Sequence, residues 1–232
     1  MCTFLNKENN KLLVAEKDIR CYKVIIEEIT DKGTEYMSEI MHFPYELNVL
    51  QHSHITTKAD TDFENLWDIS DGFHSYADVS SAILRKLHGE NFGLKEYKHV
   101  IVECIIPKGS QYYKGYDLFY DYNHYTNTPT LYTSTYVSDS IIIKRIIAKN
   151  EIPFPYQLGD CINLTDKQNN KTYITEIYRF RRTIFPNWLY VHFKGTTNED
   201  DLFCVKVDLY GKSLDDRITI EKVENKKSND IR

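Results

Sequence analysis

Few glycines, few cysteines and no long hydrophobic run are the first features of this 232-residue sequence. Nine glycines, with 41% hydrophobic and 27% charged residues, argue against a fibrous or a disordered chain. No hydrophobic stretch approaches the length of a membrane span, and the N-terminus lacks the basic and apolar segments of a secretory signal. We therefore expect a folded protein without membrane insertion, which stays in the cytoplasm or leaves it only inside a larger particle.

The small number of cysteines and the missing basic surplus each exclude a class of protein. Five cysteines cannot all pair with one another, and no Cys-x-x-Cys motif is present. Cys21 and Cys104 lie inside hydrophobic runs, which is typical of small buried residues in a reducing compartment. The net charge of −5 argues against a protein that binds mainly through phosphate contacts, so nucleic acid is not the expected partner.

Aromatic residues are abundant, with 18 tyrosines and 11 phenylalanines. Aromatic and β-branched side chains pack well on a pleated surface, so this composition favours strands. The hydrophobic runs at 21–29, 100–106 and 141–147 have the length of strands. The last two are typical of strands that are covered on both faces, in the middle of a sheet.

One clear helix is expected from Ser75 to Leu87. Ser75 is placed to cap its N-terminus, and Asp78 follows three residues later as in a capping box. Hydrophobic residues then recur on one face, and His88-Gly89 would end the helix.

Two prolines within residues 151–155 predict a boundary between two domains. Residues 1–150 are expected to form an α+β domain with a mixed sheet and one helix. Residues 151–221 contain segments in which hydrophobic and polar residues alternate, as in antiparallel strands with one solvated face. They are expected to form a small antiparallel β-barrel of SH3-like type with turns such as Asn169-Asn170, and the polar residues 222–232 a flexible tail.

Three histidines and one glutamate invite a functional interpretation. No helix or hairpin pattern directs His42, His52 and His54 toward one point, so we expect surface or loop histidines and no metal site. Glu103 lies within a hydrophobic strand, where a carboxylate is costly unless a basic residue on a neighbouring strand pairs with it. The expected partner is Lys23, Lys144 or Arg145.

A three-part pattern carries a resemblance to a known family. Gly-Phe-His-Ser at 72–75, Ile-Pro-Lys-Gly at 106–109 and the strand at 141–147 follow a first strand that contains Tyr22-Lys23. In this order the segments resemble the ADP-ribosyltransferase fold over residues 20–147. The resemblance implies a scaffold that binds NAD, with a catalytic glutamate just before its last hydrophobic strand.

The same resemblance implies which residues would act. The family's Arg or His on the first strand falls near Tyr22, with Arg20 two residues upstream, and its second motif falls on residues 73–75. Its glutamate falls on Ser138-Asp-Ser140, and a serine cannot supply the negative charge that stabilises an oxocarbenium-like transition state. The resemblance therefore implies the scaffold without catalytic residues or a cofactor. In a rearranged site, His74, Ser75 and Asp139 would be catalytic and NAD the cofactor.

A second resemblance concerns origin. Cys-Tyr-Lys-Val at 21–24, Gly-Phe-His-Ser and Ile-Pro-Lys-Gly together resemble an uncharacterised set of phage and gut-bacterial proteins. This resemblance implies a bacteriophage or prophage origin, and hence a location in the cytoplasm of a bacterial host or in a virion. It implies no activity.

Tyrosines concentrate between residues 112 and 136, which we expect to be a long connection. Tyrosine combines a large contact area with few rotatable bonds and is enriched at protein interfaces. We expect this surface to bind a protein partner or a second copy of the chain. The alternatives are a loop packed over its own sheet and a platform for stacking sugars or bases. The residues are Tyr112, Tyr113, Tyr116, Tyr120, Tyr122, Tyr125, Tyr132 and Tyr136.

Arg179, Arg181 and Arg182 form a compact basic cluster, in which Arg179 and Arg181 would share one face of an extended strand. In an acidic chain we expect them to contact a partner protein or solvent rather than nucleic acid. The leading hypothesis is a non-enzymatic structural or interaction protein of phage type, associated with the virion or its assembly. The alternative is an NAD-dependent ADP-ribosyltransferase or NAD glycohydrolase with a divergent site.

Overall fold

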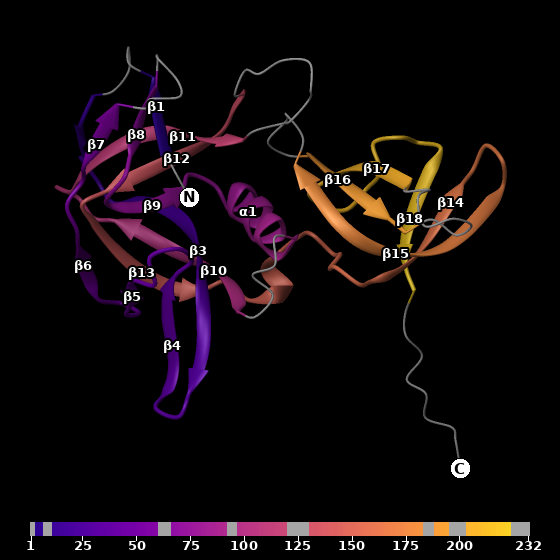
Figure 1. The fold of residues 1–232 in the computed structure, drawn as a ribbon, viewed down its shortest axis with the longest axis horizontal. Helices are drawn as coiled ribbons and strands as arrows, with labels where there is room; N and C mark the ends of the chain where they lie inside the picture. Colours follow the sequence, from indigo (N-terminus) through magenta and orange to yellow (C-terminus); the bar gives the residue numbers. More distant parts are fainter. Residues whose placement is uncertain are drawn as a thin grey trace. The chain divides into compact units, whose positions relative to one another are not determined.

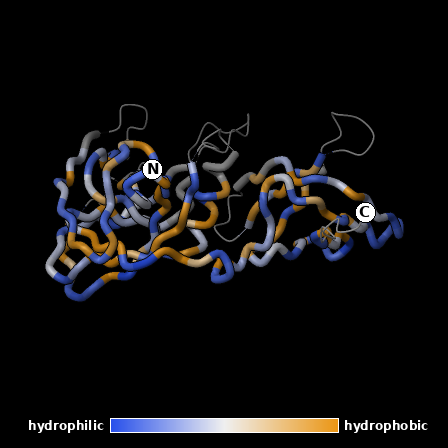
Figure 2. Tube along the Cα trace, turned by 90° about the horizontal axis from the view of Figure 1, so that it is seen from below, coloured by the Kyte–Doolittle hydropathy of each residue, from blue (hydrophilic) through white to orange (hydrophobic). Residues whose placement is uncertain are grey.

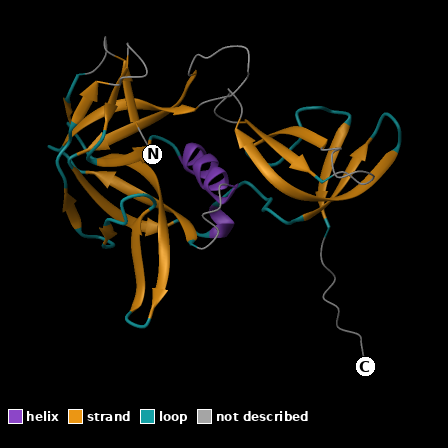
Figure 3. Cartoon of the chain, viewed as in Figure 1, coloured by secondary structure: helices purple, strands orange, loops and turns teal. Residues whose placement is uncertain are grey.

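The computed structural model describes residues 3–6, 11–59, 66–91, 97–119, 130–182, 188–194 and 203–223. Strands make up 58% of it, and within the described ranges α1 (Val79–Asn91) is the single α-helix (Figure 3). The chain divides into two compact units between Ile152 and Pro153 (Figure 1). The expected α+β fold class with one clear helix is confirmed, and one sheet is nearly closed and barrel-like.

The first unit is built on one large sheet. Its central path runs β6-β13-β10-β3-β9-β12-β11-β1-β8-β7, and β2, β4 and β5 attach to its sides. The named strands pair antiparallel, and an isolated Leu47–Ile143 bridge is parallel. The strands are β1 (Thr3–Asn6), β2 (Leu13–Val14), β3 (Ile19–Thr30), β4 (Gly33–Ser38), β5 (Pro44–Tyr45), β6 (Leu50–His52), β7 (Thr57–Ala59), β8 (Leu66–Ile69), β9 (Phe73–Tyr76), β10 (Lys98–Ile106), β11 (Gln111–Phe119), β12 (Thr130–Ser138) and β13 (Ser140–Ile146), and a 3₁₀ turn, η3 (Lys149–Glu151), follows them.

A short connection makes this sheet nearly closed. β6 and β7 stand at opposite ends of the strand order, yet only residues 53–56 separate them in the chain. An extended residue spans at most about 3.6 Å, so the two edges of the sheet must come close together. The backbone N–H of Ser53 donates to the carbonyl of Asp139, next to β13. The sheet therefore curls into a barrel-like form.

The expectation of strands covered on both faces is confirmed for β10, which lies between β13 and β3. Six of its nine residues are buried, with both faces contributing to the core. Cys104 lies directly opposite Cys21 of β3, and both are fully buried as expected. Burial raises the pKa of the Cys104 thiol well above its usual value, so this thiol packs as a small hydrophobic group. Figure 2 shows hydrophobic stretches alternating with hydrophilic ones along the chain, with hydrophilic residues at several bends.

The helix begins later than the sequence pattern predicts, and Ser75 does not cap it. Residues 73–76 form β9, which pairs with β12, and all four are buried. Asp78 is the residue that caps α1, since its carboxylate accepts the backbone N–H of Ser81 at 2.8 Å and the Ser81 hydroxyl at 2.9 Å. The prediction of Ser75 as the cap was wrong because pairing with β12 determines the backbone there.

The predicted ion pair of Glu103 is confirmed. Arg145, its neighbour on β13, donates to Oε2 at 3.1 Å, and Arg20 of β3 approaches Oε1 at 2.9 Å. Two of the three expected partners, Lys23 and Lys144, are not part of this pair. The two guanidinium groups compensate a carboxylate whose side chain is 17% exposed.

The tyrosine-rich segment is not one long connection. Residues 111–119 and 130–138 are the paired strands β11 and β12, in which Tyr113 lies opposite Val137. Tyrosine is frequent in β11, and tyrosine and threonine are frequent in β12; both residue types favour a pleated conformation. Tyr120, Tyr122 and Tyr125 lie outside the described residues.

The second unit is an antiparallel sheet of five strands in the order β17-β16-β15-β14-β18. Its strands are β14 (Cys161–Asp166), β15 (Lys171–Arg182), β16 (Trp188–Phe193), β17 (Phe203–Asp208) and β18 (Ile218–Lys222). The predicted alternation is confirmed in β16, where Leu189, Val191 and Phe193 are buried and the residues between them are partly exposed. Residues 224–232 of the expected flexible tail lie outside the described part of the chain.

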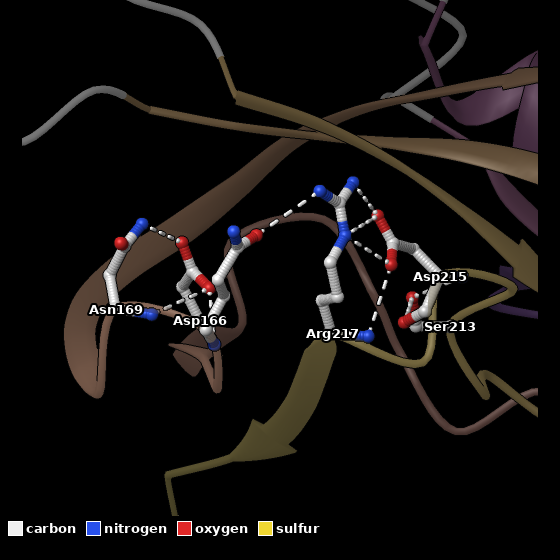
Figure 4. A network of polar contacts seen from close by, with 6 residues as sticks. Asp166, Asn169, Ser213, Asp215 and Arg217 are labelled. Atoms are coloured by element: carbon white, nitrogen blue, oxygen red, sulfur yellow. Dashed lines mark hydrogen bonds and ion pairs between the residues drawn. The ribbon is translucent and has the colours of Figure 1, made fainter.

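A polar network joins two turns of this unit (Figure 4). Arg217 donates to both carboxylate oxygens of Asp215 and, at 3.3 Å, to the amide oxygen of Gln168. Asp166 accepts from the Asn169 side chain at 2.7 Å. The hydrogen bonds from Arg217 lower the pKa of Asp215 to about 2. Because these groups use one another as partners, the network serves to order the turns, including the predicted turn at 169–170.

Replacing the cap of α1 tests the start of this helix. In Asp78→Ala, the loss of the Ser81 hydrogen bonds should lower the free energy of unfolding by about 1 kcal/mol. In Ser75→Ala, no such loss is expected, because the Ser75 hydroxyl has no hydrogen-bond partner among the described residues. Urea unfolding of both variants measures the difference. A larger loss in Ser75→Ala would contradict the assignment of Asp78 as the cap.

Candidate functional site

β9 carries two of the residues that the sequence analysis selected. His74 and Ser75 are adjacent, so their side chains leave the strand on opposite faces. Nδ1 of His74 lies 3.1 Å from the hydroxyl oxygen of Thr3 on β1. The hydroxyl of Ser75 is fully buried and has no hydrogen-bond partner in the described part of the chain. Ser75 therefore has no base among these residues to accept its proton, as a nucleophile requires.

His74 is held in its neutral form. Burial in the sheet, together with the positive charge of Lys23, lowers the pKa of His74 to about 3. A catalytic acid or base works best when its pKa lies near the working pH. His74 is therefore poorly suited to exchange a proton near neutral pH.

Asp139 lies in a bend that joins β12 to β13, rather than within a strand. Its backbone N–H donates to the carbonyl of Gln111 at 3.0 Å, and its carbonyl accepts from Ser53 at 2.8 Å. Its Oδ1 is buried and has no hydrogen-bond partner among the described residues. No hydrogen bond or ion pair recorded between described residues connects Asp139 with His74 or Ser75, so the three do not form one polar cluster.

A pocket lies where β3 separates from β9. β3 pairs with β9 at Tyr22 and Tyr76, and from Ile25 onward it pairs with β4 instead. The pocket has a volume of about 340 Å³, and residues of β3, β4, β9 and the loop after β4 line it. Its walls include the hydrophobic residues Ile40, Met41, Phe43, Tyr45, Phe73 and Tyr76, and the polar or charged residues Lys23, Ser38, Glu39, Asp71 and His74.

Lys23 places a buried ammonium group at this pocket. The residue is 8% exposed, and Nζ donates to the backbone carbonyl of His74 at 2.6 Å. The ammonium also lies 5.5 Å from the centroid of the Tyr45 ring. Among the described residues, no carboxylate forms an ion pair with it. The sequence predicts Lys23 only as a partner of Glu103, although a lysine within the hydrophobic run Cys-Tyr-Lys-Val-Ile-Ile is a signal of a special role.

Glu39, an acidic residue in the lining of the pocket, has partners of its own. Arg85 of α1 donates to Oε2 of Glu39 at 3.2 Å, and Nε2 of His99 lies 3.7 Å from Oε1. Burial alone would lower the pKa of Arg85, but the Glu39 carboxylate offsets it and raises the pKa above the usual value. The Glu39 carboxylate therefore forms its ion pair with Arg85.

The described tyrosines divide between the two faces of β11. Tyr112 and Tyr116 share one face with Tyr136, which lies opposite Lys114. The rings of Tyr112 and Tyr136 meet edge to face at 5.8 Å, and Tyr116 is 40% exposed. Tyr113 leaves the other face and packs against the buried Leu5, Ile69 and Val137. Only part of the predicted tyrosine surface is thus accessible in the described residues.

The basic cluster lies on β15 of the second unit. Arg179, Arg181 and Arg182 are opposite His192, Tyr190 and Leu189 of β16. The extended backbone places Arg179 and Arg181 at alternate positions, as the sequence predicts.

The three histidines considered as metal ligands are separate. Nδ1 of His52 lies 3.0 Å from the Ser140 hydroxyl, and Nδ1 of His42 lies 3.1 Å from the Met37 sulfur. His54 is exposed. Within the described ranges, no group of three or more His, Cys, Asp or Glu side chains is arranged to hold a metal ion.

The neutral state of His74 has a measurable consequence for stability. Its pKa is about 3 in the folded chain and about 6.5 in an unfolded one, so the unfolded chain binds more protons between these values. Stability is therefore fully present above pH 6.5 and decreases as the pH falls toward 3, by up to about 1.4 kcal/mol per pH unit.

Urea unfolding at a series of pH values measures this slope in the wild type, His74→Gln and the matched control His54→Gln. The slope should become smaller in His74→Gln and stay unchanged in His54→Gln, because His54 is exposed. An unchanged slope in His74→Gln would show that His74 titrates normally.

Comparison with known proteins finds no relative of this chain. No protein-family model, no curated protein and no solved structure matches the chain. The resemblances to ADP-ribosyltransferases and to phage proteins stay predictions. Within the described residues, no helix combines the length and the hydrophobicity that a membrane crossing needs.

Proposed function

We propose that the chain is a non-enzymatic interaction protein whose tyrosine ladder binds a protein partner. The tyrosine ladder consists of Tyr112, Tyr116 and Tyr136 on one face of β11 and β12. The observation that carries the proposal is the accessible Tyr116 ring beside a pair of tyrosines that is already ordered by edge-to-face contact.

An ordered ladder suits binding for an energetic reason. Immobilising a flexible side chain at an interface costs free energy, and tyrosine has few rotatable bonds to lose. Tyr136 also packs partly against the buried core cluster around Cys21 and Phe73, which restrains the ladder before a partner arrives. The rings offer both hydrophobic area and hydroxyl groups, the combination that interfaces favour.

A second copy of the chain is the partner that we infer from the charge of this surface. Lys114 is the one charged side chain between the three tyrosines on this face of the two strands. Between the three tyrosines, β11 and β12 themselves place no carboxylate on this face, although the whole chain has a net charge of −5. A symmetric dimer uses the same patch on both copies, which the ladder provides.

The role in a virion or its assembly that the phage resemblance implies stays a prediction within this proposal. Transferase or glycohydrolase chemistry on NAD is the weaker alternative. Neutral His74 and the partnerless hydroxyl of Ser75 weigh against it, because neither is prepared to move a proton.

Changing the ladder tests the proposed interface. In a variant that carries Tyr112→Ser and Tyr116→Ser, the dissociation constant of the dimer should rise about 30-fold or more, the effect of losing about 2 kcal/mol at an interface hot spot. Sedimentation velocity over a series of protein concentrations measures this constant. Tyr210→Ser is the control, since Tyr210 is 74% exposed in the other unit. A monomeric wild type, or equal association of all three proteins, would overturn the choice of a second copy.

A further inference from the structure

We propose that the pocket between β3 and β9, called here the Lys23 pocket, binds a small organic anion that has a hydrophobic body. The anionic group would pair with the Lys23 ammonium, and the body would lie against Tyr45, Phe43 and Phe73. This role is independent of the tyrosine ladder and uses different residues.

The first argument is the incomplete pairing of a buried charge. An ammonium group has three N–H donors, and one of them is used on the carbonyl of His74. The Tyr45 ring supplies a weak contact at 5.5 Å. A buried charge is costly unless it is paired, and no carboxylate in the described part of the chain pairs with Lys23. A ligand anion would supply the missing partner.

The second argument is the state of the other titratable groups at the pocket. His74 is neutral and contributes no charge, since its pKa is about 3. Glu39 is paired with Arg85 and approached by His99. Asp71 is exposed and accepts a hydrogen bond from the Ser70 hydroxyl at 3.5 Å. Lys23 is thus the buried charge at the pocket that lacks an opposite charge.

The third argument is size and lining. A volume of about 340 Å³ lies within the range of small-molecule sites, roughly 300–1,000 Å³. Such sites combine hydrophobic walls with a few polar groups that orient the ligand. Phe43, Tyr45 and Phe73 pack edge to face or tilted at ring distances of 5.4 to 6.3 Å, which gives the hydrophobic wall a defined shape. Met41, 81% exposed, stands at the rim where a ligand would enter.

Isothermal titration with three matched probes tests the proposal. Phenylacetate and phenyl phosphate carry different anionic groups on a similar body, and phenylacetamide is the uncharged analogue. The wild type should bind at least one of the two anions, and at least tenfold more tightly than it binds the amide. The preferred anion identifies the ligand as a carboxylate or a phosphate.

Lys23→Met keeps the length of the side chain and removes its charge, so it should weaken anion binding at least tenfold. Lys114→Met, which removes an exposed lysine, should bind as the wild type does. Circular dichroism checks that each variant is folded.

If Lys23→Met does not fold, two variants at the rim of the pocket, Met41→Glu and Met41→Lys, replace it. The glutamate variant should bind the anion more weakly than the lysine variant. Absence of anion binding by the wild type, binding of the amide equal to that of the anions, equal binding by folded Lys23→Met, or equal binding by the two rim variants would overturn the proposal.

Discussion

The pairing of β3 with β10 is the constraint on which the first unit depends. Nine residue pairs join the two strands, from Ile19 with Ile106 to Glu27 with Lys98. Because β3 has twelve residues, its other edge serves two partners, β9 near its start and β4 near its end. The change of partner occurs at Lys23 and Val24, both of which line the pocket. The pocket therefore lies where β3 is longer than either of its two neighbours on that edge: β9 pairs with it only at Tyr22, and β4 only from Ile25 onward.

Burial determines what the polar residues at this site can do. Lys23 and His74 are buried, and burial disfavours the charged form of an isolated group. The lowered pKa of His74 keeps this side chain neutral, whereas the Lys23 ammonium donates a hydrogen bond to the His74 carbonyl. A site of this kind is better suited to hold a complementary ligand than to transfer protons. This is the physical basis for proposing binding rather than catalysis.

Sequence patterns predicted elements that depend on local order, and they were wrong where distant pairing decides. The run at 100–106 became the central strand β10 because its hydrophobic side chains need cover on both faces. The run at 141–147 became β13, which lies beside the end strand β6 and exposes Lys144 and Arg145. The capping pattern at Ser75 was misleading, since a hydroxyl followed by an acidic residue also occurs in a strand that precedes a helix. The low aliphatic content of the tyrosine-rich segment predicts a connection. Its tyrosines and threonines instead favoured the hairpin of β11 and β12.

The sequence by itself determined the strand-rich class, the alternation in β16 and the need of Glu103 for a basic partner, because periodicity and the cost of burying a charge act within or between immediate neighbours. Only the tertiary structure decided which polar groups meet. The contact of Lys23 with His74 joins residues 51 positions apart, and that of Thr3 with His74 joins residues 71 apart. Such contacts depend on strand order and register, and no local pattern contains that information.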